Sequence, residues 1–320
     1  MKRVLVALAF ACSLVHAQPR QSMFVFHNNF WLNLHQFVRG EAYRRGVKAV
    51  PGVDPASLDE ADRAVWSAAV DAYADFAKRD VLFDDTLRRI ANTLAMVGEA
   101  ARLPDSAADV IGASTAATLN AAAPIYRVHV WPSRQRDNDV WIATAKALLD
   151  RHETAMAASL AAIYHITWPS DPMLVDAVGE IGPNSAVTND GPAGFAAHIQ
   201  AGAASPRNTV GAPLELLFHE ACHTLSCAGR IQAMISDESA RQKLQPPPNL
   251  WHAMIMYTSG AAARRELAKD GGTEYVPYGY RYNDQYTPAQ RSAFESDWQP
   301  YLDGKISLDQ ALHDLVRDSR

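Results

Sequence analysis

Hydrophobic residues recur at three- and four-residue steps over much of the first third of the chain. In the segments 59–78 and 86–101 this spacing places them along one face of a helix. The Ala-rich segment 107–123 is also typical of a helix, which Pro124 should end. Residues 18–125 are therefore predicted to form a largely helical N-terminal region.

The pattern changes after Pro124. Residues 126–131 alternate and are rich in β-branched and aromatic side chains, which predicts a strand that Pro132 closes. A long helix is expected over 139–165. Short strands are expected over 173–181 and 184–188, and a loop over 189–207, where turn-forming residues are frequent.

Apolar positions dominate again in the last third of the chain. Pro213 suits the first turn of a helix, and the apolar run after it continues to Gly229. Further helices are predicted over 250–269, after three consecutive prolines, and over 308–316. We therefore expect an α+β fold that is predominantly helical, with a small sheet. Residues 18–320 should form a single domain, divided into 18–125 and 126–320.

The first residues indicate an exported protein. Lys2 and Arg3 precede an apolar run from Val4 to Val15, and a small residue follows at Ala17. This is the layout of a signal peptide over residues 1–17, which predicts a secreted or periplasmic protein. Neither this run nor any later one reaches the roughly 20 apolar residues that span a bilayer, so no membrane span is expected.

Composition excludes several classes of partner. The chain has 320 residues, of which 48% are hydrophobic and 20% charged, so it can bury a core. Its 30 basic and 35 acidic residues leave a net charge of −5. A balance so mild carries no sign of nucleic-acid binding. Only Cys222 and Cys227 follow the predicted signal peptide, and within one continuous helix they would lie too far apart to bond, so no structural disulfide is expected.

The motif that carries chemistry is His219-Glu220-Ala221-Cys222-His223. Residues four apart share a helix face, so His219 and His223 can direct ring nitrogens to one ion. Imidazole nitrogens suit Zn²⁺. Glu220, at the edge of that face, can take a proton from a water that the ion activates and pass it to a leaving amine.

The motif and the predicted order of strand, long helix, strand and motif helix resemble the zincin metallopeptidases. The resemblance implies a zincin-like catalytic core within 126–320, with Zn²⁺ bound by His219 and His223 and with Glu220 as general base. It is gluzincin-like, because the metzincin pattern would have Gly at 226 and His at 229, where this chain has Ser226 and Gly229.

A catalytic zinc usually has three protein ligands, so a third must come from elsewhere in the chain. His252, at the start of the predicted helix 250–269, is our first choice. Glu238 or Asp237 come next, because the gluzincin-like pattern places a Glu after the motif, but they follow His223 closely. Glu266 and Glu274 remain as further alternatives.

Hydrolysis of a peptide bond also needs a donor for the oxyanion. The Tyr-rich segment 275–282 follows the predicted ligand helix, and we choose Tyr278 over Tyr280 and Tyr257. The predicted protein is thus an exported zinc peptidase acting on a peptide or protein substrate. Two alternatives stay open, a non-catalytic metal-binding or scaffold protein and a zinc amidase that acts on a non-peptide amide such as cell-wall material.

Overall fold

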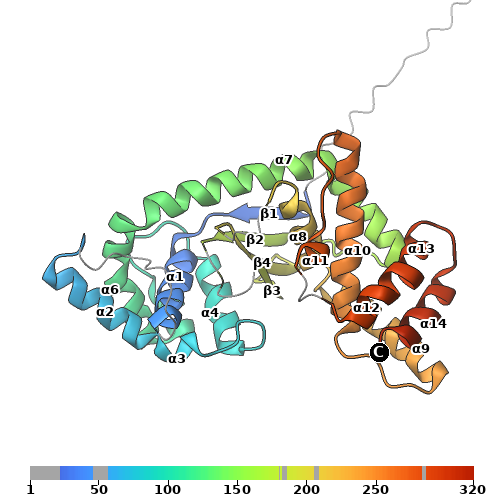
Figure 1. The fold of residues 1–320 in the computed structure, drawn as a ribbon. Helices are drawn as coiled ribbons and strands as arrows, with labels where there is room; N and C mark the ends of the chain where they lie inside the picture. The colour runs from blue at the N-terminus through green and yellow to red at the C-terminus, as the bar shows by residue number, and fades with distance from the viewer. Residues whose placement is uncertain (1–21, 46–56, 180, 182–185, 205–208, 283–285) are drawn as a thin grey trace, which may run out of the picture.

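A computed structural model describes residues 22–45, 57–179, 181, 186–204, 209–282 and 286–320. The predicted signal peptide lies outside these residues. Helices dominate, and one small sheet lies at the centre of an elongated molecule, between the N-terminal helices and the C-terminal helices (Figure 1). This confirms the predicted α+β, predominantly helical class.

The sheet has four strands in the order β1-β2-β4-β3. They are β1 (Phe24–His27), β2 (Met173–Val178), β3 (Ala186–Asp190) and β4 (Ala197–Gly202). Strand β2 runs parallel to both β1 and β4, whereas β3 runs antiparallel to β4 and forms one end of the sheet. Every residue of β2 and β4 is buried, as expected of strands covered on both faces.

Each face of the sheet contributes to a separate hydrophobic core. Met173, Val175 and Ala177 pack with the long helix α7 (Trp131–Tyr164) and with helices that follow the sheet. Leu174 and Val178 point the other way and pack with the N-terminal helices. Successive side chains of a strand point to opposite faces, so the same short strand supplies both cores.

The N-terminal helices form as the hydrophobic spacing predicts, with two that begin at an Asp cap. Asp59 and Asp84 each accept a hydrogen bond from a backbone amide in the first turn of the helix that follows. These helices are α1 (Phe30–Arg45), α2 (Glu60–Ala72), α3 (Ala74–Ala77), α4 (Asp85–Ala95), α5 (Asp105–Ile111) and α6 (Ala113–His129).

The predicted strand over 126–131 is wrong. Residues up to His129 belong to α6, which continues through Pro124, and α7 begins at Trp131. Tyr126 and Val130, four residues apart, are both buried, whereas Val128 between them is 70% exposed. This is the burial pattern of a helix. Pro132 occupies the first turn of α7, where a missing amide proton costs nothing.

Two strands occur where none was expected. Strand β1 lies in the region predicted to be helical, and β4 lies in the predicted loop 189–207. Ala197–Gly202 contains small and polar residues with little strand propensity of its own. Its neighbours β2 and β3 pair with both of its edges, and this tertiary pairing overrides the weak local preference.

The helices after the sheet build the rest of the molecule. They are α8 (Ala212–Ala221), α9 (Arg230–Gln242), α10 (Leu250–Leu267), α11 (Tyr278–Arg281), α12 (Pro288–Ala293), α13 (Gln299–Leu302) and α14 (Leu308–Asp318). Helix α8 contacts β3, β4, α7 and α10. It begins after Gly211, whose φ of 88° favours glycine and where a Cβ atom would lie 2.7 Å from a Leu267 methyl group.

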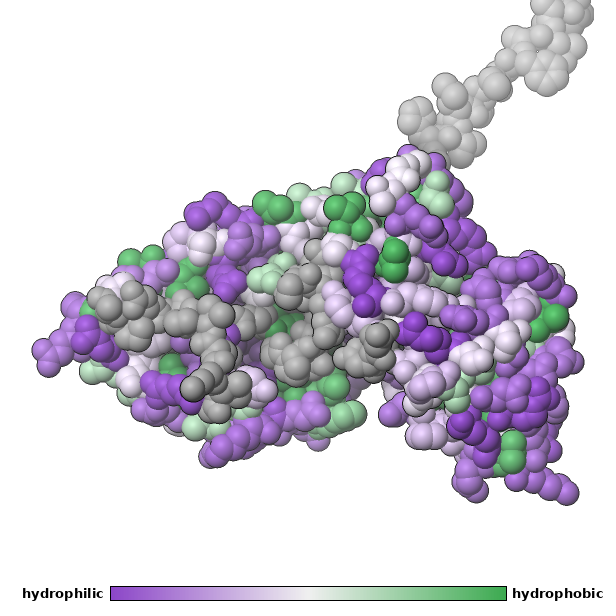
Figure 2. Space-filling view, viewed as in Figure 1, coloured by the Kyte–Doolittle hydropathy of each residue, from purple (hydrophilic) through white to green (hydrophobic). Residues whose placement is uncertain are grey.

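The surface shows hydrophobic side chains in small, separate patches among hydrophilic ones over the coloured part of the face in Figure 2. Among the described residues, no helix is both long and apolar enough to cross a membrane.

Candidate metal centre

Three histidines from two helices and a turn lie together. His219 is in the last turn of α8, His223 follows the end of that helix, and His252 is in the first turn of α10. The Nε2 atoms of His219 and His223 are 3.2 Å apart. One ring nitrogen from each of the three lies within 4.8 Å of the others. Within the described ranges, this is the one group of three or more His, Cys, Asp or Glu that could hold an ion.

The three rings are neutral at neutral pH. Burial lowers the pKa of His219 well below its usual value, and the neighbouring His223 and His252 lower it further. Burial also lowers the pKa of His223 to about 4, and burial together with His223 lowers that of His252 to about 4. A neutral imidazole keeps a lone pair, which is the form that binds a metal.

Glu220 lies beside the first histidine and is held from the sheet. Its side chain is 5% exposed, and the Thr188 hydroxyl on β3 lies 2.7 Å from its Oε2 atom. The same hydroxyl lies 3.0 Å from the Glu220 carbonyl oxygen. Burial raises the pKa of Glu220 to about 7, although the Thr188 hydrogen bond opposes the shift. A cation bound nearby would lower that pKa again, because it favours the charged carboxylate.

The second half of the motif does not continue the helix, which corrects two predictions. Helix α8 ends at Ala221, and a separate π-helical turn covers Leu225–Gly229. The Cα atoms of Cys222 and Cys227 are consequently 4.9 Å apart, and the two residues form a disulfide. The expectation of no disulfide was wrong because it assumed one continuous helix to Gly229.

The alternatives to His252 are placed away from the histidines. Glu238 on α9 contacts Gln242, His313 and Arg241. Glu266 pairs with Lys269 at 2.6 Å. Neither these two residues nor Asp237 and Glu274 belong to the histidine group.

Two residues at the centre were missed by sequence reasoning. Thr188 was predicted only as part of a strand, and no sequence signal links it to Glu220, 32 positions later. Trp251 packs edge-on against His223, with ring centroids 5.6 Å apart, and against the adjacent His252 at the same centroid distance. The only sequence signal for Trp251 was its position directly before His252, the candidate third ligand.

The Tyr-rich segment is attached to the motif helix through a buried carboxylate. Glu215, one turn before His219, accepts hydrogen bonds from the Tyr275 hydroxyl at 2.7 Å and from the Tyr278 backbone amide at 3.0 Å. The Tyr278 ring lies 4.7 Å from that of Tyr282, centroid to centroid. These contacts fix where α11 begins. The role of Tyr278 as an oxyanion donor stays a prediction, and the Tyr257 hydroxyl instead donates to Gln299.

Glu215 should make the stability of the protein depend on pH. Burial raises its pKa from 4.5 to about 7, so the folded chain keeps a proton that the unfolded chain releases in this range. The free energy of unfolding should therefore fall by about 3 kcal/mol as the pH rises through that window. Denaturant unfolding of metal-free wild type and Glu215→Gln at several pH values measures this fall. Glu220 titrates in both proteins, so the difference between their unfolding free energies at each pH isolates the contribution of Glu215. If the unfolding free energy of the two proteins changes equally with pH, the raised pKa of Glu215 is contradicted.

Comparison with protein-family models, characterised proteins and solved structures finds no match to this chain.

Proposed function

We propose that the protein is a zinc-dependent metallohydrolase of the zincin type, most readily a peptidase, with His219, His223 and His252 as ligands. The observation that carries the proposal is the convergence of three neutral imidazoles beside one buried carboxylate. Two nitrogens bound to one tetrahedral zinc at about 2.0–2.1 Å are about 3.3 Å apart. The 3.2 Å between the Nε2 atoms of His219 and His223 fits that geometry.

The chemistry of the donor set also fits zinc. Three imidazole nitrogens leave one tetrahedral position for a reacting molecule, which is the arrangement of a catalytic site. Zinc would supply a Lewis acid that polarises a carbonyl group and makes a water molecule more acidic.

Glu220 would move the proton in this reaction. Its carboxylate would accept a proton from the attacking water and donate it to the leaving amine, so one group serves both steps. The Thr188 hydroxyl, 2.7 Å from Oε2, would restrict how the carboxylate can turn. Because that hydroxyl comes from β3, the sheet and the motif helix together set the position of the base.

Strand β3 supports a peptide as the substrate. It is the end strand of the sheet, and its Thr188 contacts the candidate base. An extended peptide can add to the edge of a sheet through backbone hydrogen bonds. A peptide paired with β3 would pass close to Glu220.

Metal content tests the proposal first. We expect about one Zn²⁺ per chain in the purified wild type by elemental analysis, and its loss in both His219→Ala and His252→Ala. Glu238→Gln is the matched control, because it alters an alternative ligand that lies outside the histidine group and should keep the metal. A wild type that stays free of metal after incubation with Zn²⁺ would overturn the metal site. Zinc retained in His252→Ala would remove that residue from it.

Substrate class is decided by a second experiment. The zinc-loaded protein is incubated with a mixture of peptides and, separately, with cell-wall fragments, and the products are identified by mass spectrometry. Cleaved peptide bonds would support the peptidase, and release from cell-wall material alone would support an amidase. If neither is cleaved while zinc is bound, the protein is a metal-binding protein instead.

A further inference from the structure

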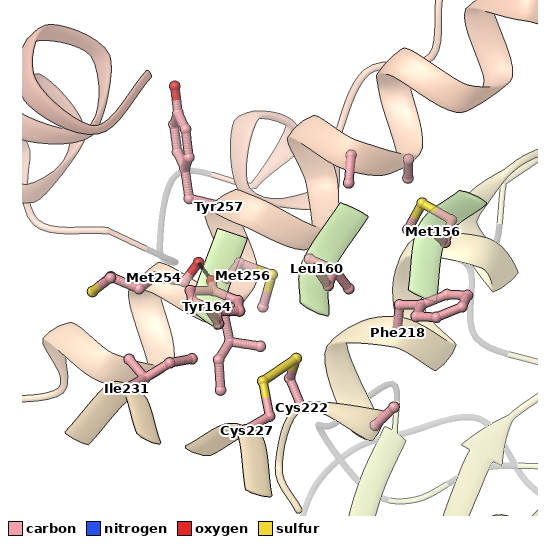
Figure 3. Close-up of a cluster of buried hydrophobic side chains, with 14 of the residues drawn as sticks. Met156, Leu160, Tyr164, Phe218, Cys222, Cys227, Ile231, Met254, Met256 and Tyr257 are labelled. Carbon is pink, nitrogen blue, oxygen red and sulfur yellow. Dashed lines mark hydrogen bonds between the residues drawn. A yellow bond between two sulfur atoms is a disulfide. The ribbon is translucent and has the colours of Figure 1, made fainter. Parts of the chain in front are cut away.

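The Cys222–Cys227 disulfide is built into the metal-binding motif itself. Cys222 lies between Glu220 and His223 in sequence, and Cys227 belongs to the π-helical turn that follows. Both cysteines are 0% exposed. Figure 3 shows the bridge within a cluster of buried side chains that includes Phe218 and Ile231.

The backbone that carries His223 has weak support from the helix. Its amide donates to the Glu220 carbonyl at 3.0 Å, three residues back, and the Thr224 amide donates to Ala221 in the same way at 3.2 Å. These are bonds of a tightened final turn, and such turns fray more readily than the body of a helix. A restraint in addition to these two hydrogen bonds is therefore needed to hold the backbone of His223 in position.

The bridge is suited to that task. Cys222 points into the core, while the next residue, His223, meets His252 with ring centroids 5.2 Å apart. The bond keeps the Cα of Cys222 within 4.9 Å of that of Cys227, so the residue preceding His223 cannot move independently. A loop this short constrains the unfolded chain less than a long one does, so much of the effect of the bridge should be local.

We propose that Cys222 and Cys227 are positioning residues of the metal site, and that the site reaches full affinity only when they are bonded. The inference rests on the proposed function in taking the three histidines as metal ligands. Formation of the bridge removes two electrons and two protons from the thiols and gives them to a disulfide oxidant, which becomes two thiols. The predicted signal peptide would deliver the chain to a compartment where such bridges form.

The direct test is Zn²⁺ binding to a variant without the bridge. Cys222→Ser combined with Cys227→Ser should bind Zn²⁺ about 10- to 100-fold more weakly than oxidised wild type, the usual cost of losing a group that orients a ligand. Ile231→Ala is the matched control. It damages the same buried cluster but keeps the bridge, so its melting temperature should fall while its Zn²⁺ affinity stays near that of wild type.

Wild-type affinity in the folded double variant would overturn the proposal, as would an equal loss of affinity in Ile231→Ala. Failure of the metal site itself looks different, because oxidised wild type would then bind no Zn²⁺.

A second measurement needs no bridge-free variant and covers the case in which that variant does not fold. Binding and bridge formation must affect each other equally, so Zn²⁺ should make the bridge harder to reduce. In glutathione buffers, two glutathione thiols supply the two electrons and two protons and become oxidised glutathione. If Zn²⁺ binds tenfold more tightly to the bridged form, saturating Zn²⁺ should lower the midpoint reduction potential of the bridge by about 30 mV. His252→Ala keeps the bridge but lacks one of the three proposed metal ligands. Added Zn²⁺ should therefore leave the midpoint reduction potential of its bridge unchanged. An unmoved wild-type midpoint would overturn the proposal.

Discussion

Replacement of Glu220 by Gln is expected to lower the hydrolytic rate about 10²- to 10⁴-fold while leaving bound zinc in place. The amide keeps the size of the side chain and can still accept a hydrogen bond from Thr188, 2.7 Å away in the wild type, but it cannot accept a proton from water. Rates on a peptide that the wild type cleaves, measured beside zinc content, separate loss of the base from loss of the metal.

Asp237→Asn is the matched control for this variant. Asp237 is exposed on α9, so the same change from carboxylate to amide should leave both rate and zinc content unchanged. A Glu220→Gln protein that keeps zinc and also keeps the wild-type rate would show that another group is the base.

The second large effect concerns stability and lies on the opposite face of the sheet from α8. His198 on β4 and Asp176 on β2 are both 0% exposed, and the His198 Nε2 atom is 2.9 Å from the Asp176 Oδ2 atom. The His198 Nδ1 atom is 2.8 Å from the Asn92 Oδ1 atom. The Asn92 amide nitrogen donates to the Asp190 carbonyl at 2.7 Å, which fixes the Asn92 oxygen toward the ring. Both ring nitrogens therefore lie within hydrogen-bond distance of an oxygen, and the buried ring links β4 to β2 and to Asn92 on α4.

His198→Ala should lower the free energy of unfolding by about 3 kcal/mol, because it leaves a buried polar side chain without its partner and a cavity in place of the ring. It leaves the buried Asp176 side chain without the ring that contacts its Oδ2 atom, and the Asp176 Oδ1 atom has no hydrogen-bond partner among the described residues even in the wild type. Denaturant unfolding at neutral pH measures the loss.

The double variant Asp176→Leu, His198→Leu provides the comparison. Replacing both polar side chains with apolar ones leaves neither of them buried without a partner, so this variant should be more stable than His198→Ala. A loss of stability below about 1 kcal/mol in His198→Ala would contradict a stabilising role for this buried contact.

The sequence predicted most of the helices, because their stability follows from spacing that is visible along the chain. The periodic segments 59–78 and 86–101 correspond to α2, α3 and α4. Residues 126–131 misled because a segment of six residues, two of them β-branched, is too short to distinguish the period of a helix from that of a strand. The burial of Tyr126 and Val130, with Val128 exposed between them, shows the helical period. Strand β4 could not be predicted from its own residues, since its pairing partners lie elsewhere in the chain.

For the candidate site, the sequence by itself determined the motif of His219, Glu220 and His223, because local spacing suffices to bring these side chains near one another. It also limited the candidates for a third ligand to a few residues. Only the tertiary structure decided that α10 brings His252 to the motif, that β3 brings Thr188 to Glu220, and that the helix ends early enough for Cys222 to reach Cys227. The first two features depend on packing between elements that are distant in sequence, and the third depends on where helix α8 ends. The local pattern of residues specifies neither the packing nor the end of the helix.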